Sequence, residues 1–247
     1  GDSPIAVALS GGGDSTALLH ALAQCFGVSR LHAIVVDHAL RDGSAGDAQR
    51  AEASACLIGV SAETITLSWA ADAKRSQQSA RMARYRALCS AAKQRGACVI
   101  ALGHTADDQA ETVFMRAAAG SGWRGLAGMA PVAPAPVWPE GLGLIVARPM
   151  LRARRGDLRA WLRSRGAAWV EDPANANLDY ERVRVRARLA ALEDGGFDPM
   201  RLVRLAERLR PIADALDREA AALIARAASF EADRIVLARK LWDAAVP

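Results

Sequence analysis

The chain has 247 residues, of which 51% are hydrophobic and 24% charged, a balance typical of a globular protein with a substantial core. Its net charge of +5 is unevenly spread, because residues 148–210 hold 15 Arg against 9 acidic residues, whereas residues 1–147 hold 12 basic and 12 acidic ones. No apolar run approaches the ~20 residues of a membrane-spanning helix, and the start of the chain does not resemble a secretory leader. We therefore expect a cytoplasmic protein with no membrane partner.

Up to about residue 150, strand and helix patterns alternate. We predict strands over Ile5–Leu9, Leu31–Val36, Glu63–Leu67 and Cys98–Leu102, and helices over Ser15–Phe26, Ala45–Ile58, Gln77–Arg95 and Ala106–Ala119. Short, mostly apolar strands that alternate with helices are typical of a parallel sheet covered on both faces. The sequence therefore predicts an α/β fold with a doubly wound, Rossmann-like parallel sheet.

The second part of the chain is mostly helical. Pro131–Gly141 contains four prolines, so we expect a surface loop there, followed by a last strand over Leu142–Ala147. Helical patterns then cover Gly156–Arg165, Tyr180–Leu192, Met200–Arg226 and Glu231–Ala245. We expect one α/β domain over residues 1–195 and a small C-terminal helical appendage over residues 196–247.

The four cysteines are widely scattered. Cys25, Cys56, Cys89 and Cys98 form no CxxC pair, and each lies in an apolar pattern. These spacings argue against a zinc site or a redox dithiol and favour buried free thiols in a reducing compartment.

Residues Ser10–Ser15 read SGGGDS between a predicted buried strand and a predicted helix. Glycines let the backbone approach an anion closely, and a helix N-terminus attracts negative charge. The serines add donors, and Asp14 can hold a divalent cation that accompanies a phosphate. The stretch lacks the Gly-Lys-Ser/Thr ending of a Walker A loop and the spacing of GxGxxG. The alternative is a tight turn in which Asp14 or Ser15 caps the helix.

A second polar stretch follows the fourth predicted strand. His104, Asp107, Asp108 and Glu111 lie near the start of one helix, where the acidic side chains can hold Mg²⁺, a cationic amine, or both. The alternative is helix capping, with Thr105 and Asp108 forming a capping box. Further along, Arg116 or Arg124 can stabilise phosphate charge, unless these are solvated surface arginines.

Two levels of resemblance emerge from these motifs. The SGGxDS stretch resembles the PP-loop of the N-type ATP pyrophosphatases. The matches to the tRNA(Ile)-lysidine synthase family are more specific and run in the family's order over residues 5–190: VDHALR (36–41), ARMARYRAL (80–88), GHTADDQAETVFMRAAAGSGWRGLAGM (103–129), RPML (148–151) and EDPANANLDYERVRVR (171–186). The chain departs from that family at Ala119 and Gln77, where relatives usually have Arg and Glu.

This resemblance implies a ligase. Such enzymes use ATP to adenylate O2 of the wobble cytidine of tRNA(Ile) with a CAU anticodon, and the ε-amine of free L-lysine then displaces AMP to give lysidine. The implied residues are Ser10, Gly11, Gly12, Gly13, Asp14, Ser15, Asp37 and His38 for ATP; His104, Asp107, Asp108, Glu111 and Arg116 for catalysis; Asp14 and Asp107 for Mg²⁺; and Arg124, Arg182, Arg184 and Arg186 for tRNA. The helical region over residues 196–247 is expected to contact tRNA as well. The oligomeric state stays open, with a homodimer among the options.

Alternatives to this interpretation come from different classes. A PP-loop tRNA thiolase usually needs a cysteine pair or an Fe–S cluster, which the scattered cysteines do not favour. A catalytically inactive RNA-binding protein on the same sheet is opposed by the intact Ser10–Ser15 stretch and the acidic cluster. The alternating arginines from Arg182 to Arg188 cover a broad helix face, which suits RNA phosphates but is also compatible with a solvated helix.

Overall fold

The computed structural model describes residues 3–39, 43–69, 76–171, 177, 179–230 and 235–239. The first half contains β1 (Ile5–Ala8), α1 (Gly13–Phe26), the 3-10 helix η1 (Val28–Arg30), β2 (Leu31–Asp37), α2 (Ser44–Leu57), β3 (Ser61–Thr66), α3 (Gln77–Gln94) and β4 (Val99–Ala101). The second half contains α4 (Ala106–Ala118), α5 (Trp123–Leu126), β5 (Val132–Pro134), β6 (Ile145–Ala147), α6 (Arg155–Ser164), α7 (Glu181–Asp194), α8 (Met200–Ala227), β7 (Ala228–Phe230) and β8 (Ile235–Leu237).

Six strands form one sheet in the order β3-β2-β1-β4-β6-β5. All neighbours pair in parallel except the edge pair β5–β6, which is antiparallel. The predicted α/β class is confirmed, with the qualification that the sheet is mixed at one edge. The central strand β1 pairs with β2 on one side and with β4 on the other, so the direction of winding reverses beside β1. The segments that follow β1 and β4 therefore meet at a topological switch point, where open α/β sheets bind ligands.

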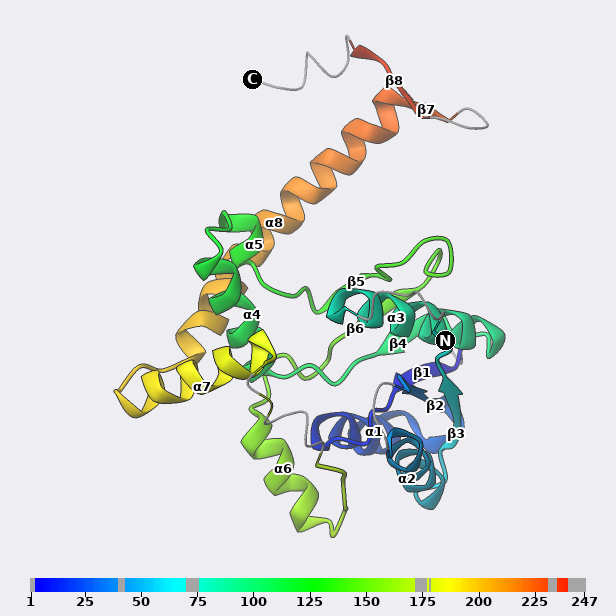
Figure 1. Cartoon of the computed structure of the whole chain (residues 1–247). Helices are drawn as coiled ribbons and strands as arrows, with labels where there is room; N and C mark the ends of the chain where they lie inside the picture. The colour runs from blue at the N-terminus through cyan, green and yellow to red at the C-terminus, as the bar shows by residue number, and fades with distance from the viewer. Residues whose placement is uncertain are drawn as a thin grey trace.

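Helices cover both faces of the sheet, as Figure 1 shows for α1 and α2 on one side and α3 on the other. Successive residues of β1 alternate between these layers: Val7 packs with the core of α1 and α2, and Ala6 packs with that of α3. The alternation explains the continuous apolar runs of the inner strands, since both faces are buried.

A separate helical layer lies beyond the end of the sheet. Ala106 and Ala110 of α4 pack with Val185 and Leu189 of α7 and with Val203 of α8. Helix α8 continues through an internal proline, Pro211, and carries the β7–β8 hairpin away from the sheet (Figure 1). No helix in the described part of the chain is long and apolar enough to cross a bilayer.

Three expectations need correction. Within the proline-rich segment, Val132–Pro134 forms the edge strand β5, where a proline is tolerated because one side of an edge strand needs no ladder donors. Ile235–Leu237 pairs with β7, so the predicted helix over Glu231–Ala245 is wrong at these residues, because a short apolar run fits a strand equally well; residues 231–234 and 240–245 lie outside the described residues. Of the four free thiols only Cys89 is buried.

Candidate functional site

The turn between β1 and α1 is built around a glycine in a left-handed conformation. Gly11 has a φ of +79°, and a Cβ there would lie 3.0 Å from the Cβ of Ala51 on α2. Its carbonyl accepts a hydrogen bond from the N–H of Val170 (2.8 Å), which ties the turn to a segment far along the chain. Glycine is therefore required at this position by both the backbone conformation and the close packing.

The serines of the same turn hold it closed. The Oγ atoms of Ser10 and Ser15 lie 3.0 Å apart, and the Ser15 hydroxyl donates to the carbonyl of Gly12 (3.0 Å). Gly12 stands at the N-cap position of α1, and within the described residues no side chain caps this helix. The first turn of α1 therefore keeps the unpaired amides and partial positive charge that suit an anion.

The end of β4 lies directly against this turn. A Cβ on Gly103 would come within 3.0 Å of the carbonyl oxygen of Asp14 and the Cα of Ser15, so the two segments touch through backbone. Helix α4 starts two residues after His104 with a complete capping box: the Thr105 hydroxyl accepts from the Asp108 N–H (3.3 Å), and the Asp108 carboxylate accepts from the Thr105 N–H (2.8 Å). The capping interpretation of Thr105 and Asp108 is thus confirmed.

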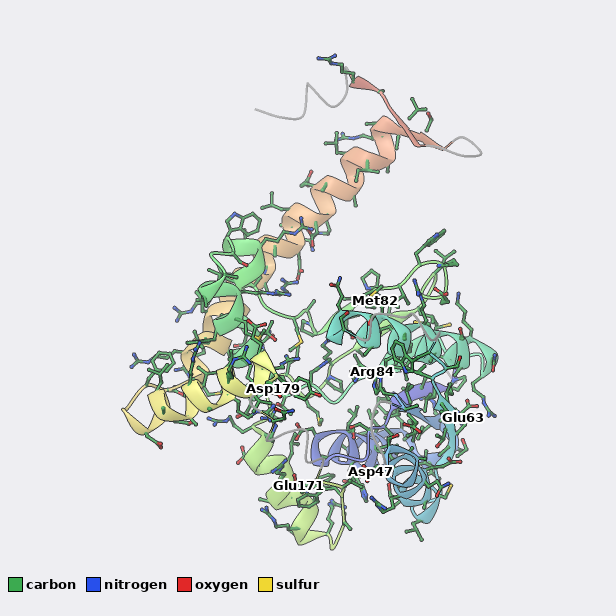
Figure 2. All side chains as sticks on the ribbon, in the orientation of Figure 1. Asp47, Glu63, Met82, Arg84, Glu171 and Asp179 are labelled. Atoms are coloured by element: carbon green, nitrogen blue, oxygen red, sulfur yellow. The ribbon has the colours of Figure 1, made fainter. Side chains whose placement is uncertain are left out.

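A cavity of about 760 Å³ opens where these two segments meet. This volume is within the usual range for small-molecule sites. Figure 2 labels three residues of its wall, which come from three separate segments: Asp47 on α2, Arg84 on α3 and Glu171 after α6. Five lining side chains carry a buried polar atom without a hydrogen-bond partner in the described structure: Asp14 Oδ1, His38 Nδ1, Arg84 Nε, His104 Nδ1 and Arg159 Nε. Because buried polar groups are normally paired, this concentration indicates a ligand site.

One arginine connects the acidic side chains of this region. Arg155, the first residue of α6, places its Nε 3.0 Å from Asp14 Oδ2 and its Nη2 3.0 Å from Asp108 Oδ1. Its Nη1 lies 3.5 Å from Glu111 Oε1, and Glu111 is 2% exposed. Arg182 and Arg186 of α7 reach Glu111 from the opposite side, at 3.1 and 2.8 Å. The carboxylates predicted to hold a cation are therefore paired with arginines from α6 and α7.

Burial and charge shift several protonation equilibria in the cavity. Burial lowers the pKa of the His104 imidazole to about 3, and the guanidinium groups of Arg148 and Arg84 act in the same direction. Burial raises the pKa of Asp14 despite its ion pair with Arg155. Burial alone would also raise the pKa of Asp108, but Arg155 and the Thr105 N–H outweigh it and hold that pKa below its usual value. His104 is therefore neutral at physiological pH, and Asp108 is ionised.

The predicted site residues divide into two groups. Those that line the cavity are Ser10, Gly12, Gly13, Asp14, Ser15, Asp37, His38, His104, Asp108, Arg182 and Arg186. Among the others, Glu111 does not line the cavity, but it forms ion pairs with Arg182 and Arg186, which do. Asp107 accepts from the N–H of Arg155 (2.7 Å) and pairs with Arg154 (3.3 Å), so its carboxylate faces the N-terminus of α6.

Arg116, near the end of α4, and Arg124, in the glycine-rich stretch, both lie away from the cavity. Arg116 donates to the carbonyls of Gly125 (2.8 Å) and Gly128 (3.0 Å), which orders that stretch. Arg124 pairs with Asp217 on α8. On α7, Arg184 is exposed, whereas Arg182 and Arg186 turn inwards, because residues four apart lie on one helix face.

Sequence reasoning missed Arg84, Arg155 and Arg159, which all line the cavity. Arg84 lies in the ARMARYRAL stretch, whose residues suggest no chemistry beyond the family resemblance, and its buried Nε has no hydrogen-bond partner among the described residues. Arg155 is one of two adjacent arginines at a helix start, and no spacing rule separates it from Arg154. Only the contacts made in the folded chain distinguish them.

Comparison with known proteins finds similar sequences over most of the chain. The PP-loop domain family matches residues 1–193. Curated tRNA(Ile)-lysidine synthases are similar to the chain: that of Hyphomonas neptunium is 43% identical over 86% of this chain and 58% of the relative, and that of Ruegeria pomeroyi is 40% identical over 86% and 50%. The chain thus spans between half and three fifths of the length of these relatives.

A solved structure supports the fold alone. The U34-tRNA thiolase NcsA from Methanococcus maripaludis superposes with a TM-score of 0.69 at 17% identity, covering 86% of this chain and 73% of that one. The turn after β1, the switch point beside it and the family match over residues 1–193 lead to one conclusion: the chain belongs to the PP-loop domain family.

Proposed function

We propose that this chain is an ATP-dependent ligase that joins free L-lysine to the wobble cytidine of tRNA(Ile) with a CAU anticodon, releasing AMP and pyrophosphate. The observation that carries this proposal is the cavity with five unpaired buried polar atoms beside the uncapped α1, in a chain 40–43% identical to named tRNA(Ile)-lysidine synthases. Such unpaired atoms favour a polar ligand, and the name of the relatives supports the proposed activity.

ATP is proposed to place its phosphates on the first turn of α1. Ser10, Ser15 and the amides of Gly12 and Gly13 would supply donors, while Gly11 shapes the turn that presents them. Asp37 and His38 at the end of β2 would contact the nucleoside. Arg84 and Arg159, whose Nε atoms are unpaired, are additional candidates for phosphate contact.

The residues present fit a magnesium ion that accompanies these phosphates. Mg²⁺ is usually held by one or two carboxylates together with substrate phosphates, and it does not need a complete protein cage. Asp14 Oδ1 is buried and has no partner among the described residues, so it is free to bind a cation. The described residues contain no group of three or more His, Cys, Asp or Glu side chains arranged to hold a metal by themselves. The metal role of Asp107 stays a prediction, since its carboxylate faces the start of α6.

The acidic side of the cavity is proposed to receive the lysine substrate. In the first step O2 of cytidine attacks the α-phosphorus of ATP and pyrophosphate leaves. In the second the ε-amine forms a bond to C2, the C2–O bond breaks and AMP leaves. The amine must lose a proton, and either Asp108 or the neutral His104 can accept it. Phosphates bound near Arg84 would offset its charge and make His104 more basic than it is in the free protein.

The tRNA is proposed to approach along the arginine-rich surface. Arg184 is exposed on α7 and Arg124 on α5, which suits contact with phosphates. The target base must leave its stack to enter the cavity, as is usual for enzymes that modify a base. A tRNA contact of residues 196–247 stays part of this proposal, and so does the division of the chain at residue 195.

The direct test is incubation of the chain with ATP, labelled lysine and either tRNA(Ile) or tRNA(Met) transcripts. We expect lysine incorporation and AMP release with tRNA(Ile) only. Absence of incorporation with both transcripts would reject the ligase proposal. The thiolase alternative is less well supported, because none of the four cysteines lines the cavity; it would gain support if sulfur were incorporated instead.

A further inference from the structure

Arg155 links the α1 side of the cavity to the α4 side by ion pairs. Its guanidinium contacts Asp14 on α1 and both Asp108 and Glu111 on α4, at distances of 3.0 to 3.5 Å. Asp14 belongs to the phosphate side of the proposed site, and Asp108 belongs to the amine side. No other arginine among the described residues bridges carboxylates of α1 and α4.

The backbone of Arg155 is held in place independently of its side chain. Its N–H donates to Asp107 (2.7 Å), so an acid from α4 occupies the N-terminus of α6. Further along α6, Leu158 packs on the core of α1, and Trp161 meets the ring of His20 edge-on at 6.4 Å. These contacts fix the start of α6, so that the guanidinium of Arg155 lies between α1 and α4.

The charges around this guanidinium explain why an arginine is needed. The facing groups are Asp14 from α1, Asp107, Asp108 and Glu111 from α4, His104 before α4, Arg159 from α6, and Arg182 and Arg186 from α7. Glu111 has two arginines besides Arg155, whereas Asp14 and Asp108 have ion pairs in the described structure with Arg155 alone. Without it, two partly buried carboxylates would repel each other across the cavity mouth. A planar guanidinium can satisfy several carboxylates at once, which an ammonium group does less well.

We propose that Arg155 is a positioning residue that fixes α1 to α4 and thereby holds Asp14 and Asp108 at the spacing that the proposed reaction uses. This inference rests on the proposed function for its catalytic consequence, but its structural part does not. Arg155 acts on the proposed reaction through these two carboxylates, which it holds by ion pairs.

The structural part can be tested by hydrogen–deuterium exchange on the full chain. In Arg155→Ala we expect faster exchange, by about threefold or more, in peptides covering both residues 8–18 and residues 103–112, with the α3 peptide unchanged. The matched control is Arg152→Ala, which removes an exposed arginine three residues earlier whose Nε lies 2.6 Å from Glu207. It should change neither peptide. Unchanged exchange in Arg155→Ala, or a change confined to one of the two peptides, would overturn the proposal.

The catalytic part is tested on the lysine transfer assay. We expect Arg155→Ala to lower kcat by about tenfold or more with little change in KM for tRNA, Arg155→Lys to recover a small part, and added guanidinium at low millimolar concentration to recover more of the Ala variant. Arg152→Ala should match the wild type. If the wild type forms no lysidine, the proposed function fails and the exchange experiment still decides the structural inference. An active wild type with an equally active Arg155→Ala would reject the catalytic part. If Arg155→Ala does not fold, Arg155→Lys carries both measurements.

Discussion

Helices α1 and α4 both begin at the switch point of the sheet, but their N-termini differ in capping. Helix α1 starts at Gly13 after a glycine N-cap and has no capping side chain among the described residues. Helix α4 starts at Ala106 with a full capping box in which Thr105 and Asp108 satisfy each other's amides. Asp14 of α1 and Asp108 of α4 line the same cavity, so the difference cannot be attributed to distance from it.

This difference shows how one edge of a sheet can serve two chemistries. An uncapped N-terminus keeps its donors for an anion from outside the protein. In a capped N-terminus, side chains already bind the backbone donors. In α4 the carboxylates of Asp108, in the cavity wall, and Glu111, behind it, form ion pairs with arginine. We infer that phosphate is received at α1 and cationic groups at α4.

The largest effect is expected when α1 is given a capping side chain. Gly12 has φ −72° and ψ 159°, which suits an N-cap residue, and a Cβ there would meet only Ser10 Oγ at 3.6 Å. Gly12→Asp should therefore fold and gain a few tenths to about 1 kcal/mol from capping and the helix dipole. The same carboxylate would repel phosphate, so ATP affinity should fall by about 100-fold or more. Calorimetric titration with ATP and urea unfolding measure the two effects.

The control for that variant is Gly122→Asp. Gly122 is the N-cap of α5, its φ is −68°, and an added Cβ meets nothing within 4 Å. It does not line the cavity, so ATP affinity should stay within about twofold of wild type. Unchanged ATP affinity in Gly12→Asp would show that the first turn of α1 is not the phosphate site.

The next largest effect is expected at Asp14, the acidic residue in the first turn of α1. Asp14→Asn keeps the shape of the side chain but removes the charge that would face a cation beside the phosphates. Because electrostatic stabilisation of developing charge is a large catalytic term, we expect AMP release to fall by about 100-fold to 1,000-fold. Binding of tRNA, measured by gel shift, should be largely retained. The neutralised exposed acid Asp157→Asn serves as the control, and turnover surviving in Asp14→Asn would refute the assignment.

Burial of His104 should make the stability of the fold depend on pH. The pKa of His104 in the folded chain is about 3, whereas an unfolded histidine has a pKa near 6.5. The unfolded state therefore takes up this proton first as the pH falls below about 6.5, and stability is lost progressively down to about pH 3. We expect His104→Gln to remove about 1 to 2 kcal/mol of the stability difference between pH 7.5 and pH 5. Urea unfolding at both values tests this, and an unchanged difference would contradict the buried neutral imidazole.

Sequence patterns were sufficient for the inner strands of the sheet, because an apolar run directly reflects burial on both faces, but they missed the edge strand β5. Each inner strand is apolar on both faces, so the run itself marks β1, β2 and β4. The strand at Ile235–Leu237 was mistaken for helix because three apolar residues have no usable period, and its partner, β7, follows directly after the long helix α8. Pairing between segments decided the structure there, and local preference did not.

The site was only half predictable for a related reason. The SGGGDS stretch consists of residue types that a tight, anion-binding turn requires. It can therefore be recognised from one continuous segment of the sequence. The bridge from Arg155 to Asp14 joins residues 141 positions apart, and nothing near Arg155 in sequence distinguishes it from Arg154. Likewise Arg182 and Arg184 look equivalent in the arginine-rich stretch, yet one meets Glu111 and the other is exposed. Which arginine faces inward depends on how α6 and α7 pack.

The smallest effect is expected at the capped helix itself. Thr105→Ala removes the hydroxyl that accepts from the Asp108 N–H and donates to its carboxylate (2.8 Å), so the free energy of unfolding should fall by about 1 to 2 kcal/mol. ATP affinity should stay within about threefold of wild type, because the phosphate donors belong to α1. Ser76→Ala, which removes the exposed cap of α3, should cost less, since water can replace its bond to the Ser79 N–H. Equal losses would mean that the α4 cap is no more important than an ordinary surface cap. A large loss of ATP affinity in Thr105→Ala would show that the two helix ends do not act separately.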